Sequence, residues 1–208
     1  MTIGRPAGSG RLPFLWLLAD WVRGHATLPG VHDEPLGRIA RLLQERNAID
    51  EEIAAITGRP MTSGHLGESV ASRIFDIELE PSAAAAGIDG VFRSAPLRGC
   101  TVNIKWYLKR EGVLDTSDSE RLDFYLVLTG PPSAAASSRG STRPWRIDAV
   151  FLFDARQLRA QQIERGVKRG VASSVVKQQW EAAQIYPIAC NPVLTVTSDQ
   201  AELLSLFC

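Results

Sequence analysis

Large apolar side chains recur at steps of three and four positions between residues 36 and 57. The series consists of Ile39, Leu42, Leu43, Ile49, Ile53 and Ile56, with Arg46 at one of its positions. Charged residues fall largely outside this series, so the spacing predicts a long amphipathic helix that Gly58 and Pro60 end. The repeat is close to a heptad, which leaves two interpretations open. The apolar side packs on the chain's own domain, the more frequent outcome, or it forms the seam of a dimer.

A second helix is predicted to follow, because Thr62 or Ser63 can cap its first turn. Its apolar residues then share one side of the helix; they are Leu66, Val70, Ile74 and Phe75. Glu68 lies at the edge of that side, in the row of Phe75. We therefore expect Glu68 at the boundary of the core and not in open water.

Strand-like runs take over after this helix. Three runs that are rich in β-branched and aromatic residues, each bounded by glycine, cover residues 87–93, 100–108 and 121–130. Residues 130–144 are rich in proline, glycine and serine, which predicts a loop. Beyond the loop the pattern predicts, in chain order, a strand, two helices and a last strand; their ranges are 145–154, 155–169, 177–184 and 192–197.

The order of these elements, a helix followed by consecutive strands, predicts an α/β meander. A chain of 208 residues with 45% hydrophobic content suits one substantial core with appendages. We therefore divide it into a helical N-terminal extension, residues 1–60, and a main domain, residues 61–208.

The extension contains one short apolar run, "RLPFLWLLADWV". Asp20 interrupts this run and no small-residue cleavage motif follows, so we do not expect a secretion signal. The run is also too short to span a bilayer. We expect a short helix that docks its large side chains on the domain or on a neighbouring subunit; they are Phe14, Leu15, Trp16 and Trp21.

Charge and cysteine content narrow the setting. Basic and acidic residues number 23 each, so the formal net charge is zero and no bulk charge attracts nucleic acid or an anionic membrane. Cys100, Cys190 and Cys208 are far apart and odd in number, which fits neither a disulfide framework nor the spacing of zinc ligands. We expect a cytoplasmic protein without membrane contact.

Polar residues interrupt the predicted strands at positions that suit one site. In "TVNIKWY" the period of two places Asn103 and Lys105 on one face of the strand, opposite the apolar residues. If the preceding strand runs antiparallel beside it, Asp89 reaches the same place, and Glu68 is the natural fourth member. Hydrolysis of a phosphodiester is served by Mg²⁺ held by oxygen ligands, with Asp89 as the expected carboxylate and Lys105 beside the phosphate or the attacking water.

These residues resemble a known family. Asp89, followed by Asn-x-Lys at 103–105 and preceded by a helix glutamate, is similar to the pattern of the restriction-endonuclease-like PD-(D/E)XK nuclease superfamily. Within it, "GIDG" followed by a strand with amide-x-Lys is most similar to the Mrr-type restriction endonucleases, which have glutamine where this chain has Asn103. The resemblance covers about residues 62–130. It implies an α/β fold with a restriction-endonuclease-like core, which is a mixed central sheet flanked by helices. It also implies cleavage of DNA that depends on Mg²⁺ or Mn²⁺.

The resemblance also implies a role for each residue. Asp89 corresponds to the metal-binding aspartate, Asn103 to the acidic or amide position and Lys105 to the catalytic lysine. Glu68 corresponds to the helix glutamate that often joins the metal shell, and the backbone carbonyl of Ile104 is a further metal ligand. A homodimer is expected, because cutting both strands of a duplex usually needs two sites.

Local clusters of basic residues support DNA as the partner. Four flank Lys105 with no acidic residue among them between positions 90 and 110; they are Arg93, Arg98, Lys109 and Arg110. Such a patch suits phosphate contacts. A second basic group, over residues 156–177, is equally well explained as a solvated helix face.

Asn103 keeps other interpretations open. An amide removes a charge and binds a hard cation more weakly than a carboxylate does. The chain is then a catalytically inactive nuclease-fold protein that binds DNA or serves as a subunit of a larger complex. A third interpretation is an enzyme that processes RNA or tRNA on the same fold.

Overall fold

The computed structural model describes residues 34–81, 87–132 and 144–208. The chain divides into two compact units, residues 1–47 and residues 48–208, and each is described by itself. The described part of the first unit is the beginning of helix α2 (Glu34–Thr57). The short helix expected around residues 12–22 lies outside the described residues.

Helices α2 and α3 confirm the two helices predicted from apolar spacing. Helix α2 ends where Gly58 takes a positive φ of 70° and donates its N–H to the Ala54 carbonyl at 2.8 Å. Helix α3 (Ser63–Phe75) begins at Thr62, whose hydroxyl accepts the His65 N–H, and ends at Asp76 in the left-handed region. The end of α2 and the start of α3 are therefore set by the local chemistry that the sequence predicted.

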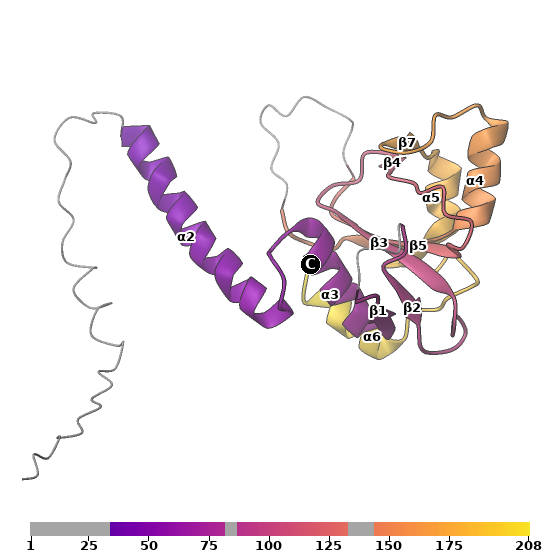
Figure 1. The fold of residues 1–208 in the computed structure, drawn as a ribbon, viewed down its shortest axis with the longest axis horizontal. Helices are drawn as coiled ribbons and strands as arrows, with labels where there is room; N and C mark the ends of the chain where they lie inside the picture. Colours follow the sequence, from indigo (N-terminus) through magenta and orange to yellow (C-terminus); the bar gives the residue numbers. More distant parts are fainter. Residues whose placement is uncertain (1–33, 82–86, 133–143) are drawn as a thin grey trace, which may run out of the picture. The chain divides into compact units, whose positions relative to one another are not determined.

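The core of the second unit is a six-stranded mixed sheet in the order β1-β2-β3-β5-β6-β8. Its strands are β1 (Ile77–Leu79), β2 (Gly90–Phe92), β3 (Thr101–Tyr107), β5 (Phe124–Thr129), β6 (Ala149–Asp154) and β8 (Gln184–Tyr186). The central pair β3–β5 is parallel and every other pair is antiparallel. Figure 1 shows β3 and β5 among the helices of this unit. The predicted α/β class with a mixed central sheet is thus confirmed.

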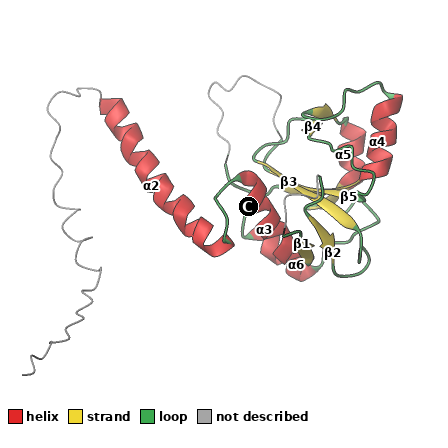
Figure 2. Ribbon diagram, in the orientation of Figure 1, coloured by secondary structure: helices red, strands yellow, loops and turns green. Residues whose placement is uncertain are grey.

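Alternate side chains of the sheet enter two separate cores. Val102, Ile104 and Trp106 of β3 lie in one core together with α3 and helix α6 (Ser198–Ser205). The second core, on the opposite face, is covered by helices α4 (Ala155–Glu164) and α5 (Lys177–Ala183). Figure 2 shows α3 beside α6 and α4 beside α5. The period of two in β3 therefore directs Asn103 and Lys105 toward the α4–α5 face of the sheet.

The structure corrects the sequence prediction toward the C-terminus. Residues 192–197, predicted as a strand, are not one; instead Thr197 caps helix α6, which was not predicted. The β6 edge is taken by β8, a strand that was not predicted and of which only Gln184 fell within the predicted helix 177–184. A small second sheet pairs β4 (Val113–Leu114) with β7 (Ser173–Ser174). The predicted loop 130–144 lies largely outside the described residues.

Candidate functional site

Asp89 ends the pairing of β2 with β3. Its backbone N–H donates to the Val102 carbonyl at 2.8 Å, as a strand residue would. Its side chain then turns to β3, where Oδ2 accepts the Ile104 N–H at 2.6 Å. The carboxylate thus takes the place of a backbone carbonyl. If the β2–β3 pairing continued, the residue before Asp89 would have supplied that carbonyl. The first consequence is structural, because Asp89 satisfies a strand N–H that would otherwise lack a partner.

Asn103 is the β3 residue between Val102 and Ile104, the two residues that Asp89 contacts. Its side chain is buried, with 4% of the residue exposed. The amide Nδ2 donates to the Gly87 carbonyl at 3.2 Å, whereas Oδ1 has no hydrogen-bond partner in the part of the chain that the structure describes. A buried amide oxygen without a donor is unfavourable by about 1–3 kcal/mol unless a ligand supplies the missing interaction.

Charged groups surround Asp89 from three elements. Burial raises the pKa of the Asp89 carboxyl above its usual value, and the nearby Glu68 carboxylate raises this pKa further. The Ile104 N–H and the positive charges of Lys105 and Arg59 lower the pKa and partly offset the effect of burial. The structure therefore brings Asp89, Glu68 and Lys105 into one electrostatic neighbourhood, as the sequence analysis expected.

Arg59 is a member of this neighbourhood that the sequence analysis missed. It lies between α2 and α3 and forms an ion pair with Glu68, whose side chain is 18% exposed. Its position next to the helix-breaking Gly58 and Pro60 gave no signal of a functional role. The pair holds Glu68 in place and neutralises its charge, so Glu68 contacts a bound cation only if it leaves or shares Arg59.

Ile104 presents its backbone to the same place. In a strand the N–H and C=O of one residue point to the same edge. Since the Ile104 N–H reaches Asp89, its carbonyl faces the same side, beyond the last β2–β3 residue pair, Gly90 with Val102. Asn103 and Ile104 are consecutive residues of β3, and Asp89 reaches the same part of β3 from the start of β2.

This donor set suits Mg²⁺ better than a transition metal. Hard cations take carboxylate, amide and backbone carbonyl oxygens, and these are the groups present. Among the residues described, no cluster of three or more His, Cys, Asp or Glu side chains is placed to hold a metal ion. A cation here would rely on one or two carboxylates and on neutral oxygens, which fits Mg²⁺ that keeps part of its water shell.

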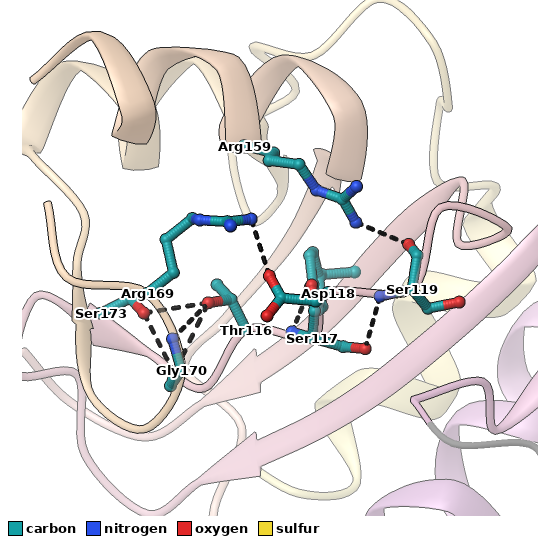
Figure 3. A network of polar contacts seen from close by, with 9 residues as sticks. Thr116, Ser117, Asp118, Ser119, Arg159, Arg169, Gly170 and Ser173 are labelled. Carbon is teal, nitrogen blue, oxygen red and sulfur yellow. Dashed lines mark hydrogen bonds and ion pairs between the residues drawn. The ribbon is translucent and has the colours of Figure 1, made fainter. Parts of the chain in front are cut away.

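A second polar network lies against the Asp89 segment. Gly87 has a positive φ of 79°, and a Cβ on it would overlap the Ser117 side chain. Ser117 belongs to a loop that Arg159 and Arg169 fasten from the α4 side: Arg159 donates to the Ser119 carbonyl at 2.6 Å, and Arg169 pairs with Asp118 at 2.7 Å (Figure 3). The network therefore fixes the surface on which Gly87 rests.

These contacts specify what the second basic group does. Arg159 and Arg169, which the sequence left open as phosphate contacts or a solvated face, are engaged by the loop 116–119. Their charges also lower the pKa of Tyr125, although burial raises that pKa overall. The loop is closed further by Thr116, which exchanges hydrogen bonds with Gly170 and Ser173.

The four basic residues expected at DNA are in different environments. Arg93 and Arg98 are exposed in the connection that follows β2. Arg110 lies over the Phe151 ring, with 5.3 Å from its guanidinium carbon to the ring centre. Lys109 differs from the expectation of a surface patch, because it is buried and its Nζ lies 2.6 Å from Glu111 Oε1. A phosphate would reach Lys109 only after this ion pair opened.

Two cavities of about 550 Å³ each lie away from Asp89. One is an open groove between α4 and α5 and the segment 191–193. The other lies beside Arg110 and Trp180. Neither includes Asp89, Asn103 or Lys105 in its lining.

No family model and no curated protein matches this sequence.

Proposed function

We propose that the chain is a Mg²⁺-dependent endonuclease that hydrolyses phosphodiester bonds of DNA. One observation carries the proposal: among the residues that the structure describes, the buried Oδ1 of Asn103 has no donor, and Asn103 is the strand residue between the two that Asp89 contacts. An amide oxygen without a donor beside a carboxylate is where a hard cation gains two ligands at once. The mixed sheet flanked by helices supports the restriction-endonuclease-like core that we propose for residues 61–208.

Each residue has a distinct task in this proposal. Asp89, Asn103 Oδ1 and the Ile104 carbonyl would hold the cation, and Glu68 would join once Arg59 released it. When bound, Mg²⁺ (or Mn²⁺) supplies Lewis-acid stabilisation of the phosphate and lowers the pKa of a bound water. Lys105 lies two positions from Asn103 on the same face, where its ammonium group stabilises the negative charge that builds up on the phosphate.

Exposed arginines of the β2–β3 hairpin suit the approach of a nucleic-acid backbone. Arg93 and Arg98 are exposed in the connection between β2 and β3, the two strands that present the site. Arginine binds phosphate oxygens in pairs, so the two residues suit a backbone contact at the other end of the hairpin from Asp89. A homodimer would place two such sites on one duplex. We propose the cytoplasm as its location, in line with three widely spaced cysteines.

A second function is supported by other contacts of the same residues. Asp89 already accepts a backbone N–H and Glu68 is already paired with Arg59, so both carboxylates have partners without a metal. These contacts favour a nuclease-fold protein that binds DNA, or acts as a subunit of a larger complex, without cutting.

Cleavage of supercoiled plasmid separates the two functions. Methylated and unmethylated plasmid are incubated with the purified protein and Mg²⁺, Mn²⁺ or EDTA. Asp89→Asn is the sharp variant, because it removes the charge but keeps an oxygen for the Ile104 N–H; Lys105→Ala tests the lysine. Asp123→Asn is the matched control, since Asp123 also accepts a β3 backbone N–H, that of Thr101 at 2.9 Å, on a strand residue outside the site.

The proposed enzyme nicks or linearises plasmid only with the metal. We expect Asp89→Asn and Lys105→Ala to lose at least about 100-fold in rate, in the range of a lost charge-stabilising group, while Asp123→Asn retains activity. Wild type that is inert with both metals but retards DNA in a gel would replace catalysis by the binding function. Equal loss in the Asp123 control would show that the effect is structural.

A further inference from the structure

A cavity of about 550 Å³ lies beside Arg110 and Trp180, and the proposed nuclease site does not use it. The rest of its lining comes from the segment that follows β3, from Pro132 after β5, and from α5 with its flanking residues. A volume of this size is typical of sites for small organic ligands. We call it the Arg110 cavity.

Arg110 brings a positive charge and unused hydrogen-bond donors to this cavity. Its guanidinium carbon lies 5.3 Å from the centre of the Phe151 ring and 6.0 Å from that of the Trp180 ring. Among the described residues the guanidinium forms no hydrogen bond and no ion pair. A contact with a ring face engages the charge and none of the N–H donors, so these donors are available to a ligand.

The surroundings of Arg110 are fixed without a ligand. Its N–H donates to the Pro131 carbonyl at 3.0 Å, and the carbonyl of Gly112, two residues on, accepts the Val175 N–H at 3.0 Å. The two rings under the guanidinium belong to the core, since Phe151 is 0% and Trp180 5% exposed. Charge interactions are stronger beside such buried apolar groups than in water, and a fixed site loses little entropy when it binds.

The other charges of the cavity cancel in pairs. Glu111 pairs with the buried Lys109, whose Nζ lies 2.6 Å from Glu111 Oε1, and Glu181 pairs with Lys177 at 3.5 Å. Three basic residues thus stand against two acidic ones, and the charge of Arg110 is the one left over. The described lining therefore favours an anion.

Trp180 adds a second donor that lacks an acceptor. Its Nε1 is buried and has no hydrogen-bond partner in the described part of the chain. The indole of Trp106, in contrast, donates to the Arg146 carbonyl at 3.3 Å. Buried N–H groups are normally paired, so the Trp180 indole points to a ligand that accepts hydrogen bonds.

Two donor groups from different elements favour phosphate over carboxylate. One guanidinium fork engages both oxygens of a carboxylate and leaves none for an indole. A tetrahedral phosphate group offers further oxygens in other directions. Arg110 follows β3 and Trp180 belongs to α5, so the two residues approach a ligand from separate segments.

We propose that the Arg110 cavity binds the phosphate group of a phosphate ester. Arg110 holds two phosphate oxygens, and the Trp180 indole donates to a third. The ester is either free, as in a nucleoside monophosphate, or part of a nucleic-acid strand. This is a second site, and it does not depend on whether the chain cuts DNA.

Nuclear magnetic resonance of the indole N–H groups tests the site in the full chain. The protein, in EDTA, is titrated with inorganic phosphate, thymidine monophosphate and a thymidine dinucleotide joined by one phosphodiester. Trp180→Phe identifies the Trp180 signal among those of the five tryptophans. At least one probe should shift this signal to saturation, because the N–H gains an acceptor. The Trp106 indole already has one and should not move.

Three variants assign the phosphate contact. Arg110→Gln should weaken binding at least about 10-fold, since the charged fork is lost. Arg110→Lys keeps the charge but not the paired donors, so it should recover only part of the affinity. Arg156→Gln is the matched control: it removes the same group from a 74% exposed side chain outside the cavity, and should bind like wild type. Thermal unfolding checks that each variant folds.

The probes also distinguish the two sources of phosphate. Tighter binding of the monophosphate supports a free nucleotide, and tighter binding of the dinucleotide supports a strand. The proposal is overturned if no probe shifts the Trp180 signal to saturation, if acetate binds as well as the phosphates, or if Arg156→Gln loses as much affinity as Arg110→Gln. Since no cleavage is measured and no metal is present, either result leaves the proposed nuclease function to its own test.

Discussion

At the scale of single residues, Asp89 combines a structural contact with a charge that burial disfavours. Its Oδ2 is fixed by the Ile104 N–H, and the rest of the carboxylate is left between Glu68 and Lys105. A residue that only capped a strand would not need this surrounding of ionisable groups. Perturbed carboxyl groups of this kind gather at functional sites, which is why Asp89 is the first residue to test.

The raised pKa of Asp89 predicts how stability depends on pH without metal. The folded pKa lies above the unfolded value near 3.8, so the folded chain holds the proton more tightly. Asp89 therefore stabilises the fold most at pH below 3.8, and this contribution is lost as pH rises through the folded pKa. In EDTA, the stability of Asp89→Asn relative to wild type should therefore rise as the pH increases from 3.8 to the folded pKa of Asp89. Urea unfolding at several pH values measures it; a difference that does not change with pH would contradict the prediction.

Gly87 combines a left-handed backbone conformation with a close neighbour, the side chain of Ser117. Gly87→Ala must place a Cβ in a left-handed conformation and against Ser117, so we expect a loss of about 2–4 kcal/mol in the free energy of unfolding. Gly99→Ala separates the two causes, because Gly99 has a similar φ of 85° and open space around its Cβ position. Thermal and urea unfolding should show a smaller loss for Gly99→Ala, about 1–2 kcal/mol. Equal losses would mean that Ser117 yields to the added Cβ.

At the scale of elements, helix α6 is attached to α3 by one glutamine. The Gln200 side chain accepts the Thr197 N–H at 3.0 Å and donates to the Ile74 carbonyl at 3.0 Å. It thus completes the capping box of α6 and joins this helix to the last turn of α3.

Gln200→Ala should therefore lower the free energy of unfolding by about 1–3 kcal/mol, because two hydrogen bonds are lost together. Differential scanning calorimetry measures the change. Gln178→Ala on α5, where the glutamine is exposed, is the control and should stay within about 0.5 kcal/mol of wild type. Identical melting temperatures for the two variants would mean that α6 is held by Leu204 and its apolar neighbours alone.

Long periodic elements were predictable, and short ones were not. Helix α2, helix α3 and strand β3 carry enough repeats for the period to be read from the sequence. In the segment 192–197, alternating apolar residues led to the prediction of a strand. Leu194 and Val196 do pack on the core, yet within the described part of the chain the segment pairs with no strand. Asn191 donates instead to the Leu152 carbonyl at 2.8 Å, which uses the β6 edge for a side chain. The strand predicted there was therefore wrong.

At the scale of the whole molecule, the site is an assembly of neighbours in space. The period of two predicted the common face of Asn103 and Lys105, and the hairpin predicted that Asp89 joins them. No local pattern announced that Arg59 pairs with Glu68, because that contact depends on how the chain turns between α2 and α3. Lys109 shows the converse, since a basic run in the sequence gave no sign that one member is buried with Glu111.

A helix that crosses a membrane needs about 20 consecutive, mostly apolar residues. No helix among residues 34–81, 87–132 and 144–208 is long and apolar enough to cross a membrane.

The small sheet of β4 and β7 consists of two residue pairs, Val113 with Ser174 and Leu114 with Ser173. Polar contacts hold the segment around it: Thr116 bonds to Gly170, and Asp115 Oδ1 accepts the Ala172 N–H at 2.8 Å. Contacts of this kind are replaced by water at little net free energy. In hydrogen exchange, residues 111–119 would therefore form their own opening unit, with amides that exchange before those of β3 and β5. The surface under Gly87 would then be the part of the fold that solvent deuterium reaches first, while the sheet that carries Asn103 stays closed.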